Sequence, residues 1–140
     1  MRRSWFTCGL VLLLLVGLTS YTWAGKTCPA GETCKCVGSK ACAYSCAGEG
    51  CKFKTMGSGN GSFDCEKGKC EAKSMGSGTV KLKCPGGKCK LSHQGSGLAV
   101  LDCPGKGCDM RCLGSGTCIL KNCKKGCTLS CLGTGTCKKE

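Results

Sequence analysis

We predict that this chain folds as an all-β protein, a narrow β-solenoid of 19-residue coils that is stapled by disulfides. Three observations lead to this prediction. A Gly-Ser-Gly tripeptide returns every 19 residues, buried and polar residue types alternate inside each repeat, and 19 of the 140 residues are cysteine. A fixed period over successive repeats is typical of stacked structural units. Cysteine at this density in a short chain is typical of a disulfide scaffold.

The first 24 residues have the layout of a secretory signal peptide. Arg2 and Arg3 precede an apolar run over residues 10–18, and the stretch 20–24 that follows ends in small residues suited to cleavage. The run is shorter than the roughly 20 residues that a membrane-spanning helix needs, so we expect cleavage after Ala24 or Gly25. The protein is therefore expected to be secreted, periplasmic or located at the cell surface. Cleavage would leave a net charge of +11 and an even 18 cysteines, which favours complete pairing.

The remaining chain divides into a cap and a repeat region. Residues 25–37 contain three cysteines and are expected to form an irregular N-terminal cap. Residues 38–140 are expected to form the solenoid, with five full repeats and a partial sixth that ends in charged residues. A charged end suits a stack that must not polymerise. The repeats begin at Gly38, Gly57, Gly76, Gly95, Gly114 and Gly133.

Each repeat is expected to contain two short strands. Cysteine and leucine occupy alternate positions in residues 117–121 and again in residues 126–131 of the fifth repeat. A period of two indicates extended strands with one face inward. The Gly-Ser-Gly tripeptide would turn the chain at one edge of the coil, and a glycine-containing arc such as residues 104–107 would turn it at the other. Coils stacked about 4.8 Å apart would pair each strand with its neighbours.

The spacing of the cysteines indicates which of them pair. Counting the first Gly as position 0, positions 8 and 13 flank the arc and are both cysteine in the first four repeats. Two further positions lie six residues apart, one on each side of the Gly-Ser-Gly turn. At three of the six turns both positions are cysteine, and at the other three neither is. Both placements suit the Cα separation of about 4.4–6.8 Å that a disulfide requires. Pairing within a coil would give Cys28–Cys34, Cys36–Cys42, Cys46–Cys51, Cys65–Cys70, Cys84–Cys89, Cys103–Cys108, Cys112–Cys118, Cys123–Cys127 and Cys131–Cys137.

An alternative pairing remains open at this stage. Equivalent cysteines of successive coils would lie about 4.8 Å apart, so disulfides could also form a ladder between coils. The joint presence and joint absence of cysteine on the two sides of the turn favours pairing within a coil.

No catalytic site and no cofactor are expected. His93 is the single histidine, has no carboxylate close by in sequence, and is expected to be structural or solvated. No Cys-x-x-Cys motif precedes a predicted helix, which argues against redox catalysis. Only Cys34 and Cys36 have the close spacing of a dense thiolate cluster, so a thiolate metal site is the less favoured alternative.

Most outward positions are basic. The net charge of +11 that remains after cleavage favours contact of a rigid rod with an anionic polysaccharide or a membrane surface. The alternative is that the lysines only keep the protein soluble. Sequence-specific nucleic-acid binding is not expected, because Tyr44, Phe53 and Phe63 fall on inward positions and cannot stack on bases. The basic surface is expected to include Lys81, Lys83, Lys88, Lys90, Lys106 and Lys121.

The glycine-rich turns and inward cysteines resemble, in architecture, those of the beetle antifreeze β-helices. Members of that family have a shorter repeat and a flat outer ladder of Thr-x-Thr. Here the outward triplets are mixed, for example Ala41, Ala43 and Ser45, so the resemblance does not imply ice binding. The Gly-x-Gly-x-x-[Val/Leu] pattern of residues 38–137 is also similar to secreted bacterial repeat proteins of unknown function.

These observations favour an exported, non-enzymatic structural or binding module that contacts anionic surfaces or polymers. A secreted cationic effector that acts on membranes is the alternative. A thiol-rich metal store is a third hypothesis.

Overall fold

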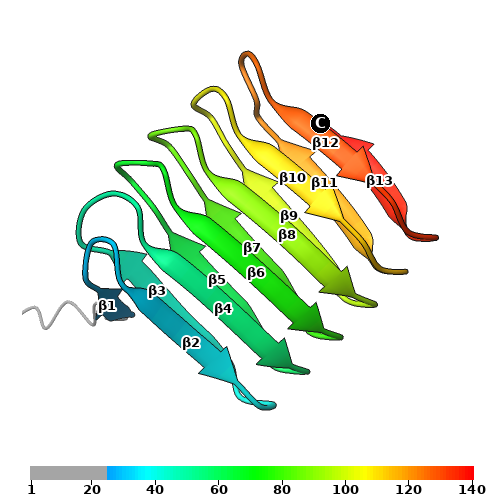
Figure 1. The fold of residues 1–140 in the computed structure, drawn as a ribbon, viewed down its shortest axis with the longest axis horizontal. Helices are drawn as coiled ribbons and strands as arrows, with labels where there is room; N and C mark the ends of the chain where they lie inside the picture. Colours follow the sequence, from blue (N-terminus) through cyan, green and yellow to red (C-terminus); the bar gives the residue numbers. More distant parts are fainter. Residues whose placement is uncertain (1–24) are drawn as a thin grey trace, which may run out of the picture.

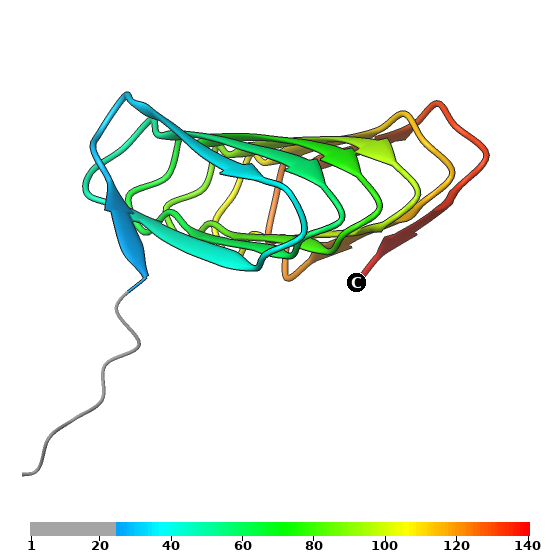
Figure 2. The same ribbon diagram turned by 90° about the horizontal axis from the view of Figure 1, so that it is seen from below.

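The computed structural model describes residues 25–140, and the predicted signal peptide, residues 1–24, lies outside the described residues. The described chain consists of thirteen short strands without a helix and winds as a β-solenoid (Figure 1). The predicted fold class is therefore confirmed. Each coil contributes one strand to each of two sheets, and Figure 2 shows these sheets as two facing layers.

The two sheets contain alternate strands of the chain. Sheet A has the order β1-β3-β5-β7-β9-β11-β13, and sheet B has the order β12-β10-β8-β6-β4-β2. Sheet A comprises β1 (Lys26–Cys28), β3 (Cys42–Cys46), β5 (Gly61–Asp64), β7 (Val80–Lys83), β9 (Leu98–Asp102), β11 (Thr117–Lys121) and β13 (Thr136–Lys139). Sheet B comprises β2 (Thr33–Val37), β4 (Lys52–Gly57), β6 (Glu71–Gly76), β8 (Lys90–Gly95), β10 (Asp109–Cys112) and β12 (Thr128–Cys131).

Every strand pairs in parallel with the strand of the next coil. Leu82 of β7 lies opposite Phe63 of β5 on one side and opposite Leu101 of β9 on the other. These partners are 19 residues apart, so the period of the sequence is the register of the sheets. Equivalent residues of successive coils therefore form straight rows along the solenoid axis, which is typical of repeat architectures.

The interior is a narrow file of side chains between the two sheets. Phe53 and Phe63 are buried and stack with their ring centroids 4.5 Å apart. Further along the axis, aliphatic side chains replace them. A disulfide lies on the arc side of every coil, whereas the turn side has one in only three coils. The largest buried aliphatic side chains are Leu82, Leu91, Leu101, Met110 and Leu120.

The Gly-Ser-Gly turns stack so closely that no side chain fits at the glycine positions. A Cβ atom added at Gly95 would overlap the carbonyl oxygen of Gly76 in the preceding coil, and one added at Gly97 would overlap that of Gly78. The serine between them stays exposed. Backbone hydrogen bonds also link successive turns, as from the Gly116 N–H to the Gly95 carbonyl oxygen at 3.0 Å. The tripeptide is thus required by the contact between coils.

Residues 25–37 are regular, contrary to the expectation of an irregular segment. This segment contains β1 and β2, which extend sheets A and B by one strand each. Cys34 lies in register with Phe53 and Cys36 with Thr55, both on the inward face of β4. Residues 33–37 alternate like the strands of the later coils, and this alternation governs the fold even though the Gly-Ser-Gly tripeptide is missing.

Candidate functional site: two disulfide columns and a basic surface

The structure joins all eighteen described cysteines in disulfides within single coils. The bonds are Cys28–Cys34, Cys36–Cys42, Cys46–Cys51, Cys65–Cys70, Cys84–Cys89, Cys103–Cys108, Cys112–Cys118, Cys123–Cys127 and Cys131–Cys137. Their Cα atoms lie 5.8 to 6.5 Å apart. These are the within-coil pairs that the spacing indicates, and no disulfide of the described chain links two coils as a ladder would.

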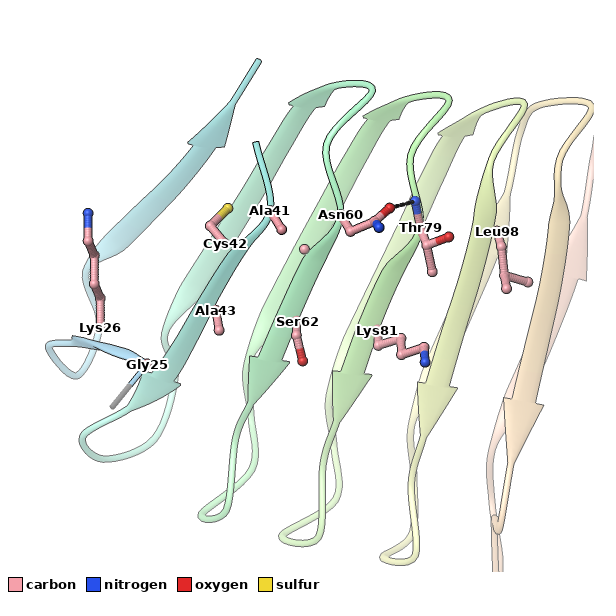
Figure 3. A pocket seen from close by; sticks show the side chains of 11 residues that line it. Gly25, Lys26, Ala41, Cys42, Ala43, Asn60, Ser62, Thr79, Lys81 and Leu98 are labelled. Atoms are coloured by element: carbon pink, nitrogen blue, oxygen red, sulfur yellow. Dashed lines mark hydrogen bonds between the residues drawn. The ribbon is translucent and has the colours of Figure 1, made fainter. Parts of the chain in front are cut away.

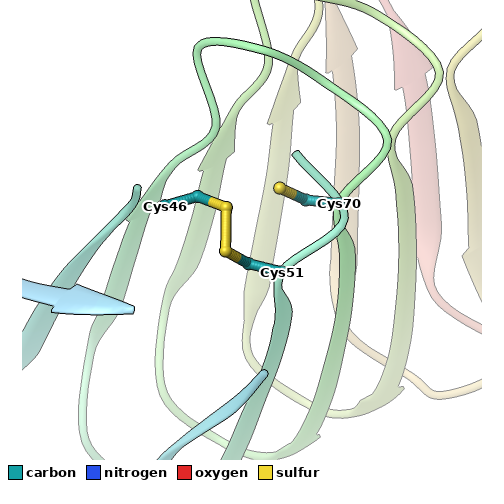
Figure 4. A group of neighbouring side chains, drawn as sticks. All are labelled: Cys46, Cys51 and Cys70. Carbon is teal, nitrogen blue, oxygen red and sulfur yellow. A yellow bond between two sulfur atoms is a disulfide. The ribbon is translucent and has the colours of Figure 1, made fainter. Parts of the chain in front are cut away.

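Five of the disulfides form a column beneath the arcs. Neighbouring disulfides of this column are close: the sulfur atoms of Cys46, Cys51 and Cys70 all lie within 4.8 Å of one another (Figure 4). A similar group contains Cys103, Cys108 and Cys127. Metals bind the thiolate form of cysteine, and a sulfur atom in a disulfide carries no thiolate charge. Metal binding at these groups would therefore require prior reduction.

The six lysines of the predicted basic surface lie on three different surfaces. Lys81 and Lys83 of β7 and Lys121 of β11 point outward from sheet A, and Lys90 of β8 points outward from sheet B. Lys88 and Lys106 lie in the arcs between the sheets. The structure therefore does not gather the six lysines into one patch.

Three of these lysines have acidic neighbours. Lys83 lies in register between Asp64 and Asp102 on sheet A. Lys90 lies in register between Glu71 and Asp109 on sheet B. Opposite charges on adjacent strands stabilise a sheet modestly, so these side chains are partly neutralised. The third is Lys121, whose Nζ lies 3.2 Å from a Glu140 carboxylate oxygen.

The arcs carry a second group of lysines, and three of the arcs contain no acidic residue. We call the residues 47–50, 66–69, 85–88, 104–107 and 124–126 the arc edge. It carries six lysines and two glutamates, Glu49 and Glu66, and both glutamates lie in the first two arcs. Lys106 and Lys125 form a parallel backbone bridge, so their side chains belong to adjacent coils. The lysines are Lys67, Lys69, Lys88, Lys106, Lys124 and Lys125.

An apolar row along sheet B was not found from the sequence. The exposed large hydrophobic residues of the described chain are Val37, Met56, Met75, Leu113 and Leu132, and each directly precedes the first residue of a Gly-Ser-Gly turn or its variant. The same position in the third repeat is Gln94. We call these six residues the apolar row. Comparing the position before each turn between repeats would have revealed the apolar row, but the sequence prediction considered apolar residues only at inward positions.

The outer face of sheet A has a shallow hollow at its N-terminal end (Figure 3). Small side chains form its floor, among them Ala41, Ala43 and Ser62, and the longer Lys81 and Leu98 border it. The Asn60 side-chain oxygen accepts a hydrogen bond from the Thr79 N–H at 3.0 Å, so this oxygen is already paired within the sheet. The hollow therefore reflects small residues on and beside β3 and β5, and it brings no group of acids, bases or nucleophiles together.

His93 is buried inside the coil. Its side chain is 1% exposed, and neither ring nitrogen has a hydrogen-bond partner. Burial lowers its pKa, and the nearby Gly97 backbone acts in the opposite direction. Of the two expected roles, a structural histidine agrees with this buried position, and a solvated histidine does not. No carboxylate lies beside it in β6 or β10, where its partners are Ser74 and Cys112.

Comparison with known proteins finds no match, whether to a family model, a curated protein or a solved structure. Within residues 25–140, no helix is long and apolar enough to cross a membrane. The structure defines the chain as a disulfide-rich parallel β-solenoid with 19-residue coils. Its extensive disulfide bonding is typical of extracellular proteins.

Proposed function

We propose that the protein is an exported, non-enzymatic binding module that contacts anionic surfaces or polymers through its rigid basic edge. The arc edge supports this proposal most directly, because its last three arcs contain lysines and no acidic residue. Positive charge that is not neutralised locally attracts polyanions and is sensitive to salt.

Rigidity also supports a binding role. Every coil has a disulfide at its arc, and three coils have a second one at the Gly-Ser-Gly turn or its variant. The lysine side chains of the arcs therefore extend from a backbone with little freedom to rearrange. A preorganised surface loses less conformational entropy on binding than a flexible basic tail does. The described residues bring no nucleophile, general base and carboxylate together, which is why the proposal is a binding module and not an enzyme.

Salt-dependent retention on immobilised heparin tests this function. We expect the wild-type protein to be retained at low salt and to elute as salt rises. The variant Lys106→Gln/Lys124→Gln/Lys125→Gln should elute at clearly lower salt, with the slope of log K against log[salt] reduced by about 0.7–0.9 for each lysine that contacts the polymer.

A matched control removes the same net charge from elsewhere. Lys83→Gln/Lys90→Gln/Lys121→Gln eliminates three lysines that have acidic neighbours, and we expect a smaller change in elution. Equal elution of the two triple variants would refute the assignment to the arc edge. Leakage of anionic vesicles at the same protein concentration would instead support the membrane-active effector.

A further inference from the structure

The outer face of sheet B carries a basic row directly beside the apolar row. The basic row contains Lys35, Lys54, Lys73 and Arg111, interrupted by Ser92 and followed by Ser130, in continuous strand register. Each member lies two residues before a member of the apolar row, so both rows project from the same face. The two rows run side by side along the length of the solenoid.

We propose that this face docks on a lipid bilayer that contains anionic headgroups. The apolar row would enter the boundary between headgroups and acyl chains, and the basic row would contact the lipid phosphates. The inference rests on the proposed contact with an anionic surface and names both the partner and the face. It assigns a surface other than the arc edge.

The exposure of the apolar row supports this docking. Its three inner hydrophobic members are 37 to 41% exposed, whereas Val37 and Leu132, which lack a neighbouring coil on one side, are 67% and 72% exposed. Single exposed hydrophobic residues are ordinary on a protein surface, but five of them aligned along one face, interrupted only by Gln94, mark an interaction site. Six coils at about 4.8 Å place the ends of this line roughly 24 Å apart.

The charge of the face indicates which partner covers it. Its outward residues include six basic side chains, from Lys35 to Arg111, and two acidic ones, Glu71 and Asp109. The acids pair with Lys73 at 3.2 Å and with Arg111 at 3.5 Å. Exposed pairs of this kind contribute little, so lipid phosphates can compete for the cations. Apolar residues beside lysines and arginines are the pattern of interfacial binding to anionic lipids.

Two other occupants fit less well. A second copy of the chain would present the same net positive face, and like charges would oppose the association. A polysaccharide gains little from the apolar row, because no aromatic ring of the described chain lies on this face to stack on sugars. Phe53 and Phe63 are buried, and the partly buried Tyr44 packs against the core from β3 of sheet A.

The test measures how much protein sediments with lipid vesicles. The wild type and every variant are prepared in the same way, as protein recovered after export. We use vesicles of phosphatidylcholine alone and vesicles of phosphatidylcholine with phosphatidylglycerol. The test variant is Met56→Gln/Met75→Gln/Leu113→Gln, since Gln94 shows that glutamine is accommodated in this row. We expect the wild type to bind only the anionic vesicles and the variant to bind them at least about tenfold more weakly.

The control variant Leu98→Gln/Val100→Gln/Ile119→Gln replaces three half-buried apolar residues on the outer face of sheet A. It should bind the anionic vesicles as the wild type does. A second variant, Lys54→Gln/Arg111→Gln, should weaken vesicle binding without replacing any apolar residue. The apolar-row variant should keep its heparin retention, which separates this face from the arc edge.

Two results would overturn the proposal. One is an apolar-row variant that folds and binds anionic vesicles like the wild type. The other is a wild type that is retained on heparin but does not bind anionic vesicles, in which case the polymer is the partner and the proposed function stands. If heparin and vesicles both fail to bind the protein, the proposed function fails as well.

Discussion

At the residue scale, His93 shows what the interior of a coil tolerates. It lies across the Gly-Ser-Gly turn from Ala99. At the same two positions, one other coil has the disulfide Cys112–Cys118. Two further coils have the smaller pairs Thr55 with Gly61 and Ser74 with Val80. The large imidazole therefore faces a small partner, and the space is filled without a disulfide. The consequence is a buried titratable group without a hydrogen-bond partner.

Protonation of His93 should destabilise the fold. Because burial lowers the pKa of His93 below the ordinary histidine value of about 6.5, the unfolded chain binds the proton more readily than the folded one. The stabilisation is complete above pH 6.5 and is lost as the pH falls below it. Urea unfolding of the wild type between pH 7 and about pH 5, where most carboxylates remain ionised, should show a falling free energy of unfolding.

Two variants separate this effect from general acid sensitivity. His93→Thr should remove most of the pH dependence in this window, and His93→Cys/Ala99→Cys should remove it while adding a disulfide like Cys112–Cys118. If either variant folds and keeps the wild-type slope, the loss of stability does not come from His93.

At the element scale, the Gly-Ser-Gly turn is a close backbone contact between successive coils. Its two glycines touch the backbone of the preceding turn, and its serine faces solvent. On the opposite edge, the arc tolerates Pro104, Lys106 and variable length, as in the fifth repeat, where Asn122 adopts a φ of 59° and Cys123–Cys127 spans one residue fewer. The strict repetition of the tripeptide therefore reflects packing between elements.

Substitution of one turn glycine should be strongly destabilising. In Gly95→Ala, the new Cβ would overlap the Gly76 carbonyl oxygen, so the two coils must separate. Overpacking of this kind costs about 1–3 kcal/mol or more. The adjacent Ser96→Ala, which changes an exposed side chain, should alter the free energy of unfolding by less than about 0.5 kcal/mol. Chemical denaturation of both variants measures the difference, and similar values would contradict the proposed contact.

At the scale of the whole molecule, disulfides occupy the interior that a larger protein fills with hydrophobic side chains. The third coil buries Leu82 and Leu91 as its largest apolar side chains, together with Val80 and His93. So few apolar groups do not offset an ordering cost of about 1.5 kcal/mol per residue over a 19-residue coil. Each short disulfide loop adds roughly 2 kcal/mol by restricting the unfolded chain.

The fold could be predicted because period, alternation and cysteine spacing all report on stacking. The 19-residue interval is the register itself, and the alternation around Leu120 identifies the inward face. β1 and β2 were missed because their coil lacks the tripeptide that marked the repeats. The apolar row depends on neighbours in adjacent coils, so it becomes evident only when the outward positions of the repeats are aligned by register.

The fold depends most on its oxidised interior, and one combined measurement tests this dependence directly. Free thiols are titrated in protein from its native compartment, and circular dichroism is recorded before and after reduction. We predict almost no free thiol in the native protein and loss of the β-sheet signal on reduction, because the remaining apolar core is too small. A native protein with about eighteen free thiols, or one that keeps its β-sheet signal after complete reduction, would contradict the account.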